Sequence, residues 1–146
     1  MNKISTDIKD KITARINALD KIQELAGIKN KRETAQSIIE WNTKTFPDAT
    51  RTGQIEKFLE EQAEFLDALE NDDDYMSELA DMFIVGCGCG RFDPIDMLFC
   101  MSEVWKGIRE CDTNLIKVML AINAKMNINR KRHWKKSGDG SYKHVK

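Results

Sequence analysis

The pattern of apolar positions repeats at helical spacing along almost the whole chain. From residue 4 to residue 25, isoleucines and leucines recur every three or four positions, which predicts an amphipathic helix capped by Ser5 or Thr6 and ending near Gly27. No segment alternates apolar and polar residues between turn signals, as strands do. The sequence therefore predicts an all-α fold, a helical bundle. Its remaining helices are expected over residues 32–44, 54–70, 75–91, 94–110 and 114–132.

Few residues interrupt this pattern. Pro47 lies in the clearest loop of the first half, residues 45–53, and stops the preceding helix. Residues 71–74, Asn-Asp-Asp-Asp, form a short turn, and Asp93 followed by Pro94 marks another helix start. From His133 onward the chain is basic and is expected to be a loop. We therefore predict one domain over residues 1–146, in which residues 1–30 are an extra N-terminal helix and residues 133–146 a basic tail.

Length and composition exclude several classes of protein. A chain of 146 residues is long enough to bury a core, and no apolar run reaches the roughly 18 residues needed to cross a bilayer. The first residues lack the apolar segment of a signal peptide, so a cytoplasmic protein without a membrane partner is expected. The cysteines are then expected to be reduced and buried as small apolar residues; they are Cys87, Cys89, Cys100 and Cys111.

The net charge of −1 hides two blocks of opposite sign. Residues 56–81 hold eleven acidic residues and one base, Lys57, whereas residues 125–146 hold eight Lys or Arg and one acid. Such blocks can simply be solvated faces, and the basic block can also be a tail that binds polyanions. Alternatively they meet at one site, where the acids hold a divalent cation and the bases hold a phosphorylated ligand.

Two carboxylates interrupt the most apolar helix. Between residues 76 and 90 the only charged residues are Glu78 and Asp81, and a helix that is apolar nearly all round is expected to be buried. Three positions apart, the two acids lie about 60° apart on one face. Buried carboxylates repel each other and lose solvation, so a bound divalent metal is the natural compensation.

The preceding helix carries a matching pair, Glu61 and Glu64. The short turn makes the two helices antiparallel neighbours, so both pairs can face each other and form a cage of oxygen ligands. Such a cage prefers Mg²⁺, with Mn²⁺ as a possible substitute, over zinc. The alternative is that Glu60, Glu61 and Glu64 simply cover a solvated face.

These motifs together resemble a known enzyme family. Glu60-Glu61-Gln62-Ala63-Glu64, a thirteen-residue gap and Glu78-Leu79-Ala80-Asp81 are similar to the motifs of the MazG-like all-α nucleoside triphosphate pyrophosphohydrolases. Residues 125–132, Lys-Met-Asn-Ile-Asn-Arg-Lys-Arg, resemble the segment of that family that faces the triphosphate. Residues 41–47 and 138–144 resemble phage and bacterial members. The N-terminal helix and the long region 86–120 are departures, which bear on assembly more than on chemistry.

The resemblance implies an enzyme that cleaves a (d)NTP between the α- and β-phosphates, giving (d)NMP and pyrophosphate, for nucleotide-pool control or house-cleaning. Metal ions held by the two acidic pairs would bridge phosphate oxygens and activate a water, which Glu61 or Glu64 would orient or deprotonate. Lys125 and Arg132 would neutralise the charge that develops on pyrophosphate. Asn129, between them on the same side of the helix, would bond the sugar or base.

The resemblance says less about how the base is recognised and how the subunits assemble. Trp41 and Phe46 either stack on the nucleobase or pack in the core. Relatives assemble as homodimers or homotetramers, so a homo-oligomer is expected, with the apolar stripe of residues 4–25 as an extra contact. No specific nucleic acid is expected as a partner.

Two other functions remain open from the sequence. A phosphoribosyl-ATP pyrophosphatase shares the acidic helices of the resembled family. A non-catalytic helical adaptor could instead use the basic tail to bind nucleic acid or an acidic protein, but it would not need Glu78 and Asp81 inside an apolar helix.

Overall fold

The protein is all-α, as the hydrophobic pattern predicts. The computed structural model describes residues 3–25, 32–136 and 142–145, in which there are six helices and two short strands. By its internal contacts the chain divides into two units, Met1–Arg32 and Glu33–Lys146, which are described separately below. The second unit corresponds to the helical bundle, and the first to the extra N-terminal helix expected over residues 1–30.

The first unit contains one helix, α1 (Lys3–Leu25). It begins at Lys3, so Ser5 and Thr6 lie inside the helix and do not cap it as predicted. The apolar stripe already starts at Ile4, and this extends the helical pattern upstream of both residues. Within the described part of this unit, no second element is available to cover the isoleucine face of α1.

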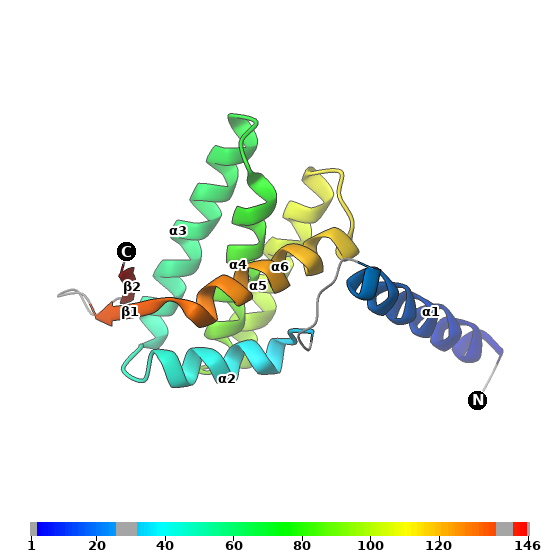
Figure 1. Cartoon of the computed structure of the whole chain (residues 1–146), viewed down its shortest axis with the longest axis horizontal. Coiled ribbons are helices and arrows are strands. Elements are labelled where there is room, and N and C mark those ends of the chain that lie inside the picture. The colour runs from blue at the N-terminus through cyan, green and yellow to red at the C-terminus, as the bar shows by residue number, and fades with distance from the viewer. Residues whose placement is uncertain (1–2, 26–31, 137–141, 146) are drawn as a thin grey trace. The chain divides into compact units, whose positions relative to one another are not determined.

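The second unit is built around one central helix (Figure 1). Helix α4 (Tyr75–Cys89) packs against α2 (Ala35–Thr45), α3 (Arg51–Glu70), α5 (Pro94–Glu110) and α6 (Leu115–Lys131). The tight turn between α3 and α4 makes these two helices antiparallel neighbours, as expected. This arrangement leaves α4 with little surface in solvent.

The core confirms the prediction for the apolar helix. Eight of the fifteen residues of α4 are buried, and around them lie Ile38 of α2, Phe65 of α3 and Ile122 of α6. Burying this much apolar surface is the main favourable term in folding. Any charged group on α4 is therefore held at a fixed place close to the core. The buried residues of α4 are Leu79, Ala80, Met82, Ile84, Gly86, Cys87, Gly88 and Cys89.

Side-chain caps fix the helix boundaries. Thr34 caps α2 in a capping box, in which its hydroxyl accepts from the Ser37 amide at 3.0 Å and the Ser37 hydroxyl accepts from the Thr34 amide at 2.8 Å. Thr50 accepts from the Gly53 amide at 3.0 Å, so α3 begins three residues earlier than predicted and shortens the preceding loop. Asp93 caps α5 with Pro94 in the first turn, as predicted.

The C-terminal segment differs from the expected loop. Strands β1 (His133–Lys136) and β2 (Tyr142–Val145) form an antiparallel hairpin, with Trp134 opposite His144. The aromatic side chains of the hairpin pack against Phe46, at the C-terminal end of α2. Four-residue strands rich in lysine carry little strand signal, and contact with a residue almost a hundred positions away decides the conformation.

Among the described residues, no helix combines the length and apolarity needed to span a bilayer. All four cysteines are free thiols; Cys87, Cys89 and Cys100 are buried and Cys111 is half-buried. Burial raises the pKa of the Cys87 thiol to about 12, which makes it unreactive.

Candidate functional site

A single pocket of about 370 Å³ collects most of the residues that the sequence singled out. It lies among α2, α3, α4, α6 and the C-terminal hairpin, and its volume is in the range of small-ligand sites. Every candidate site residue from the sequence lines it; these are Trp41, Phe46, Glu61, Glu64, Glu78, Asp81, Lys125, Asn129 and Arg132.

Helical spacing brings these side chains together. On α3, the lining residues Gln54, Lys57, Glu61 and Glu64 are separated by steps of three or four and therefore share one face. On α6 and its C-cap the same steps separate Lys125, Asn129 and Arg132. The pocket is thus acidic where α3 faces α4 and basic along α6.

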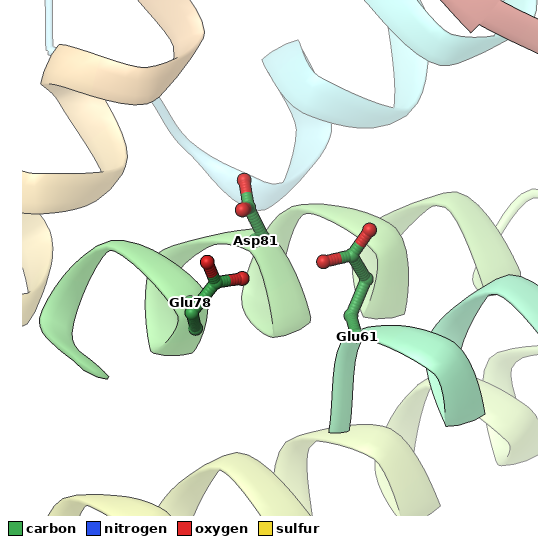
Figure 2. A group of neighbouring side chains, drawn as sticks. All are labelled: Glu61, Glu78 and Asp81. Atoms are coloured by element: carbon green, nitrogen blue, oxygen red, sulfur yellow. The ribbon is translucent and has the colours of Figure 1, made fainter. Parts of the chain in front are cut away.

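Three carboxylates converge at the acidic end. Oxygen atoms of Glu61, Glu78 and Asp81 all lie within 4.8 Å of one another. Figure 2 shows Glu61 reaching from α3 toward the two acids of α4. Glu61 is only 7% exposed, and Glu78 and Asp81 are half-buried. The predicted inward-facing acidic cage therefore has these three residues as its centre.

Two oxygens of this cluster are buried and without a partner. Neither Oε2 of Glu61 nor Oε2 of Glu78 accepts a hydrogen bond from any described residue. A buried carboxylate oxygen without a donor costs free energy that a proton or a cation can offset. The cluster could therefore hold a cation at these atoms.

Burial and mutual repulsion both oppose ionisation here. Desolvation is the larger cause and the charge of Asp81 the next; together they raise the pKa of Glu61 to about 7, although Lys57 acts in the opposite direction. Desolvation, then Asp81 and Glu64, also raise the pKa of Glu78. Burial raises the pKa of Asp81 as well, against the lowering effect of Lys125. The nearby lysines therefore do not supply enough positive charge to stabilise all three carboxylates in their ionised form at neutral pH.

Two lysines partly compensate. Lys125 Nζ lies 3.2 Å from Asp81 Oδ2, and Lys57 Nζ lies 3.2 Å from Glu61 Oε1 and 3.4 Å from Glu60 Oε2. Burial alone would lower the pKa of Lys57, but these carboxylates outweigh burial and raise it. Both lysines line the pocket, so the same groups can face a bound anion.

Glu64 lies at the edge of the cluster. Its side chain is exposed and lines the pocket, close enough to Glu78 to raise the pKa of that residue. It is not part of the three-residue group, although it lies on the same face of α3 as Glu61. Of the four predicted ligands, the structure thus gathers three tightly and leaves Glu64 beside Glu78 at the rim.

The wall formed by the C-terminal end of α6 is basic, and hydrogen bonds connect its residues to one another and to the hairpin. Asn129 is 6% exposed; its Oδ1 accepts from Arg132 at 3.4 Å and its carbonyl accepts from the Trp134 indole at 3.4 Å. Arg132 is the C-cap of α6, one residue beyond the helix, and still faces the pocket. These contacts tie the hairpin to the basic wall.

An aromatic cluster surrounds Phe46. The ring centroid of Phe46 lies 5.3 Å from that of Trp41, 5.1 Å from that of Trp134 and 4.8 Å from that of Tyr142. All four residues line the pocket, and His144, whose ring lies 5.9 Å from Trp134, lines it too. Trp41 and Phe46 therefore both pack on neighbours and border the pocket, and stacking on a nucleobase stays a prediction.

Several lining residues were not singled out from the sequence. Asn42 and Gln54 are buried polar residues of the pocket wall, and Trp134 and Tyr142 come from the hairpin. The spacing of Gln54 relative to Lys57 and Glu61 could have predicted that all three lie on one face of α3. The hairpin gave no such signal, because its position depends on tertiary contacts.

The donor set fits a hard cation. The group consists only of carboxylates, which suits Mg²⁺ or Mn²⁺ and not zinc, and the unpaired oxygens of Glu61 and Glu78 are available to it. Glu64 could complete the coordination from the rim.

Comparisons with known proteins add no relative: no protein-family model, curated protein or solved structure matches this chain. Its function is therefore inferred from the pocket itself.

Proposed function

We propose that this protein is a Mg²⁺-dependent nucleoside triphosphate pyrophosphohydrolase, which hydrolyses a (d)NTP between the α- and β-phosphates to (d)NMP and pyrophosphate. The observation that carries the proposal is the pair of unpartnered, buried carboxylate oxygens on Glu61 and Glu78. Both residues line a pocket that also holds Lys125 and Arg132. A cation–triphosphate complex matches this division of charge.

The residues divide the chemistry among them. Glu61, Glu78 and Asp81 would hold the cation, which when bound supplies Lewis acidity toward phosphate oxygens and acidifies water. Glu64, exposed at the rim, would accept the proton of the attacking water. Because the cation would then balance the charge of Asp81, Lys125 would be free to donate to the leaving pyrophosphate, together with Arg132. Asn129 would hold the sugar or base, beside Trp41 and Phe46.

The two alternatives fit less well. An adaptor that binds through a basic tail does not account for buried, unpaired carboxylates, since such groups cost stability unless a ligand uses them. A phosphoribosyl-ATP pyrophosphatase would use the same acidic helices, and no feature of the described pocket favours that substrate over a (d)NTP.

Analysis of the products tests the function directly. Each of the eight common NTPs and dNTPs is incubated with protein and millimolar Mg²⁺, and pyrophosphate and orthophosphate are measured separately. Pyrophosphate with an equal amount of monophosphate is the expected result. Orthophosphate, or no product from any of the eight and from phosphoribosyl-ATP, would contradict the proposal.

We further propose that the chain acts as a homodimer or homotetramer in the cytoplasm, where its substrate and Mg²⁺ are both present. From Ile4 to Leu25 the apolar residues of α1 are spaced by 3.5 positions on average, the period of a left-handed coiled coil. On α5, Ile95, Leu98 and Phe99 are each more than half exposed. Apolar surfaces of this kind are typical of contacts between subunits.

A further inference from the structure

We infer that the part of the pocket beside α2 reads the hydrogen-bonding edge of a nucleobase through the side-chain amides of Asn42 and Gln54, and that Arg91 is the positioning residue that sets their polarity. This inference rests on the proposed function and adds a specificity device to it. Both amides line the pocket, and Gln54 lies two turns of α3 before Glu61, or about 10 Å along the helix.

The orientation of the Asn42 amide is fixed by Arg91. Nη1 of Arg91 donates to Oδ1 of Asn42 at 2.8 Å, and also to the carbonyl oxygens of Asn42 at 3.2 Å and of Phe46 at 2.9 Å. A guanidinium group can only donate, so Oδ1 must face Arg91 and the Nδ2 donor must face away from it. Asn42 is 3% exposed, and within the described chain Nδ2 donates no hydrogen bond. Nδ2 is therefore an unused donor, available to a ligand, on a largely buried residue.

The Gln54 amide is fixed in the opposite sense. Its Nε2 donates to the backbone carbonyl of Val85 at 3.2 Å, and a carbonyl can only accept. The Oε1 acceptor is therefore left over, and no donor in the described residues reaches it. Gln54 is 8% exposed. One amide thus offers a donor and the other an acceptor.

Gly88 brings the two amides together. A Cβ atom at this position would lie 2.5 Å from Gln54 Nε2 and 2.7 Å from Asn42 Nδ2, closer than real contacts allow. Both amide nitrogens therefore lie against α4 at Gly88. Such close packing keeps the amides in place before a ligand binds, which is the condition for discrimination by hydrogen bonds.

The neighbouring surface suits a flat heterocycle. Phe46, Trp134 and Tyr142 present aromatic rings to the same pocket. Aromatic faces stack on any base without selecting one, whereas a fixed donor beside a fixed acceptor accepts only bases whose edge is complementary. The ligand class is therefore a nucleobase recognised by its Watson–Crick edge, with the triphosphate directed toward Lys125.

Substrate profiles test this inference. We compare kcat and KM for dATP, dGTP, dCTP and dTTP in the native chain, in Asn42→Ala and in Gln54→Ala. We expect the native chain to prefer one base by about tenfold or more in kcat/KM, and each variant to lose about tenfold for that base, mainly through KM. The poorest substrates should change less, so the profile flattens. Thr43→Ala, an exposed neighbour outside the pocket, is the matched control and should keep the native profile.

Two further variants address folding and positioning. Asn42→Asp keeps the acceptor toward Arg91 but removes the donor, and should alter the order of the four substrates in a protein with native helicity. Arg91→Lys, whose shorter side chain places its ammonium group farther from Oδ1 of Asn42, should raise KM for the preferred base and leave kcat within about twofold. An equal loss for all four bases in every folded variant would overturn the inference.

Binding of monophosphates separates this inference from the proposed function. The four dNMPs are titrated by quenching of tryptophan fluorescence, which needs no turnover because Trp41 and Trp134 border the pocket. Base-dependent quenching that Asn42→Ala abolishes would support the base-reading pair even if no (d)NTP were hydrolysed. Quenching that is equal for all bases would overturn it even if hydrolysis were observed.

Discussion

Lys125 Nζ on α6 lies 3.2 Å from Oδ2 of Asp81 on α4, so the basic and acidic segments of the sequence meet at one ion pair inside the pocket. Each side chain of this pair is 21% exposed. Helix packing thus brings part of the two blocks of opposite charge together around a shared cavity.

Replacing Lys125 tests the basic wall. Lys125→Met should lower the rate of pyrophosphate release by about 100-fold, since it removes a charge directed at the leaving group. It should also weaken the ion pairing of Asp81 and raise the pKa of that carboxyl further. Lys117→Met, on the same helix but exposed and outside the pocket, is the control and should retain native activity. Similar rates in the two variants would mean that Lys125 serves only to neutralise Asp81.

Replacing the acids of α4 tests the cage. Glu78→Gln and Asp81→Asn should each lower the turnover rate by about 100-fold or more, because an amide cannot supply the charge that binds a cation. Their helical circular dichroism should remain native, since the substitutions conserve volume. Full activity in both variants would show that other residues carry the reaction.

The metal-free protein should lose stability as the pH rises. A Glu61 pKa of about 7 in the folded state, against about 4.5 unfolded, means that the folded chain holds a proton that the unfolded chain has released. Stability is therefore greatest below about pH 4.5 as far as this group is concerned, and that contribution is lost as the pH rises through 7. Melting temperatures in EDTA should fall by several degrees between pH 5 and 8.

Glu61→Gln isolates that effect. It should remove most of the pH dependence in EDTA and raise the melting temperature at pH 8, because burial of a charge and its repulsion by Asp81 are both relieved. Glu60→Gln is the matched control, since Glu60 is the adjacent residue but its side chain is 66% exposed. If both variants followed the native curve, Glu61 would not be a destabilised carboxylate.

The α1 stripe should determine the assembly state. Ile12→Asp with Ile16→Asp places two charges on the apolar face and should lower the molar mass measured by light scattering. Thr13→Asp with Asn17→Asp has the same spacing and added charge on a different face of the same helix, and should leave the mass unchanged. A monomeric native chain, or equal masses in the two double variants, would contradict self-association through this stripe.

The bundle and the acidic cluster could be predicted because their signals are local. Glu78 and Asp81 stand out as the only charges in an apolar helix, and their spacing alone places them on one face. Glu61 and Glu64 gave equal signals, yet one is buried and the other exposed. Only the rotation of α3 against α4 distinguishes them, and that rotation is a property of packing.

The aromatic and amide part of the pocket could not be predicted for the same reason. Arg91 meets Asn42 across 49 positions of sequence, and Phe46 meets Tyr142 across an even longer interval. The hairpin is held by contacts such as that of Tyr142 with Phe46, and it has little strand propensity of its own. Long-range contacts of this kind produce no periodic pattern of residues from which they could be predicted.

Mn²⁺ binding followed by electron paramagnetic resonance tests the central claim most directly, because it needs neither substrate nor turnover. At pH 8 the native chain and Glu60→Gln should bind Mn²⁺ with similar affinity, and Mg²⁺ should compete. Glu61→Gln, Glu78→Gln and Asp81→Asn should each weaken binding by about tenfold or more. Equal affinity in all five proteins, or no binding by the native chain, would show that these carboxylates do not form a metal site.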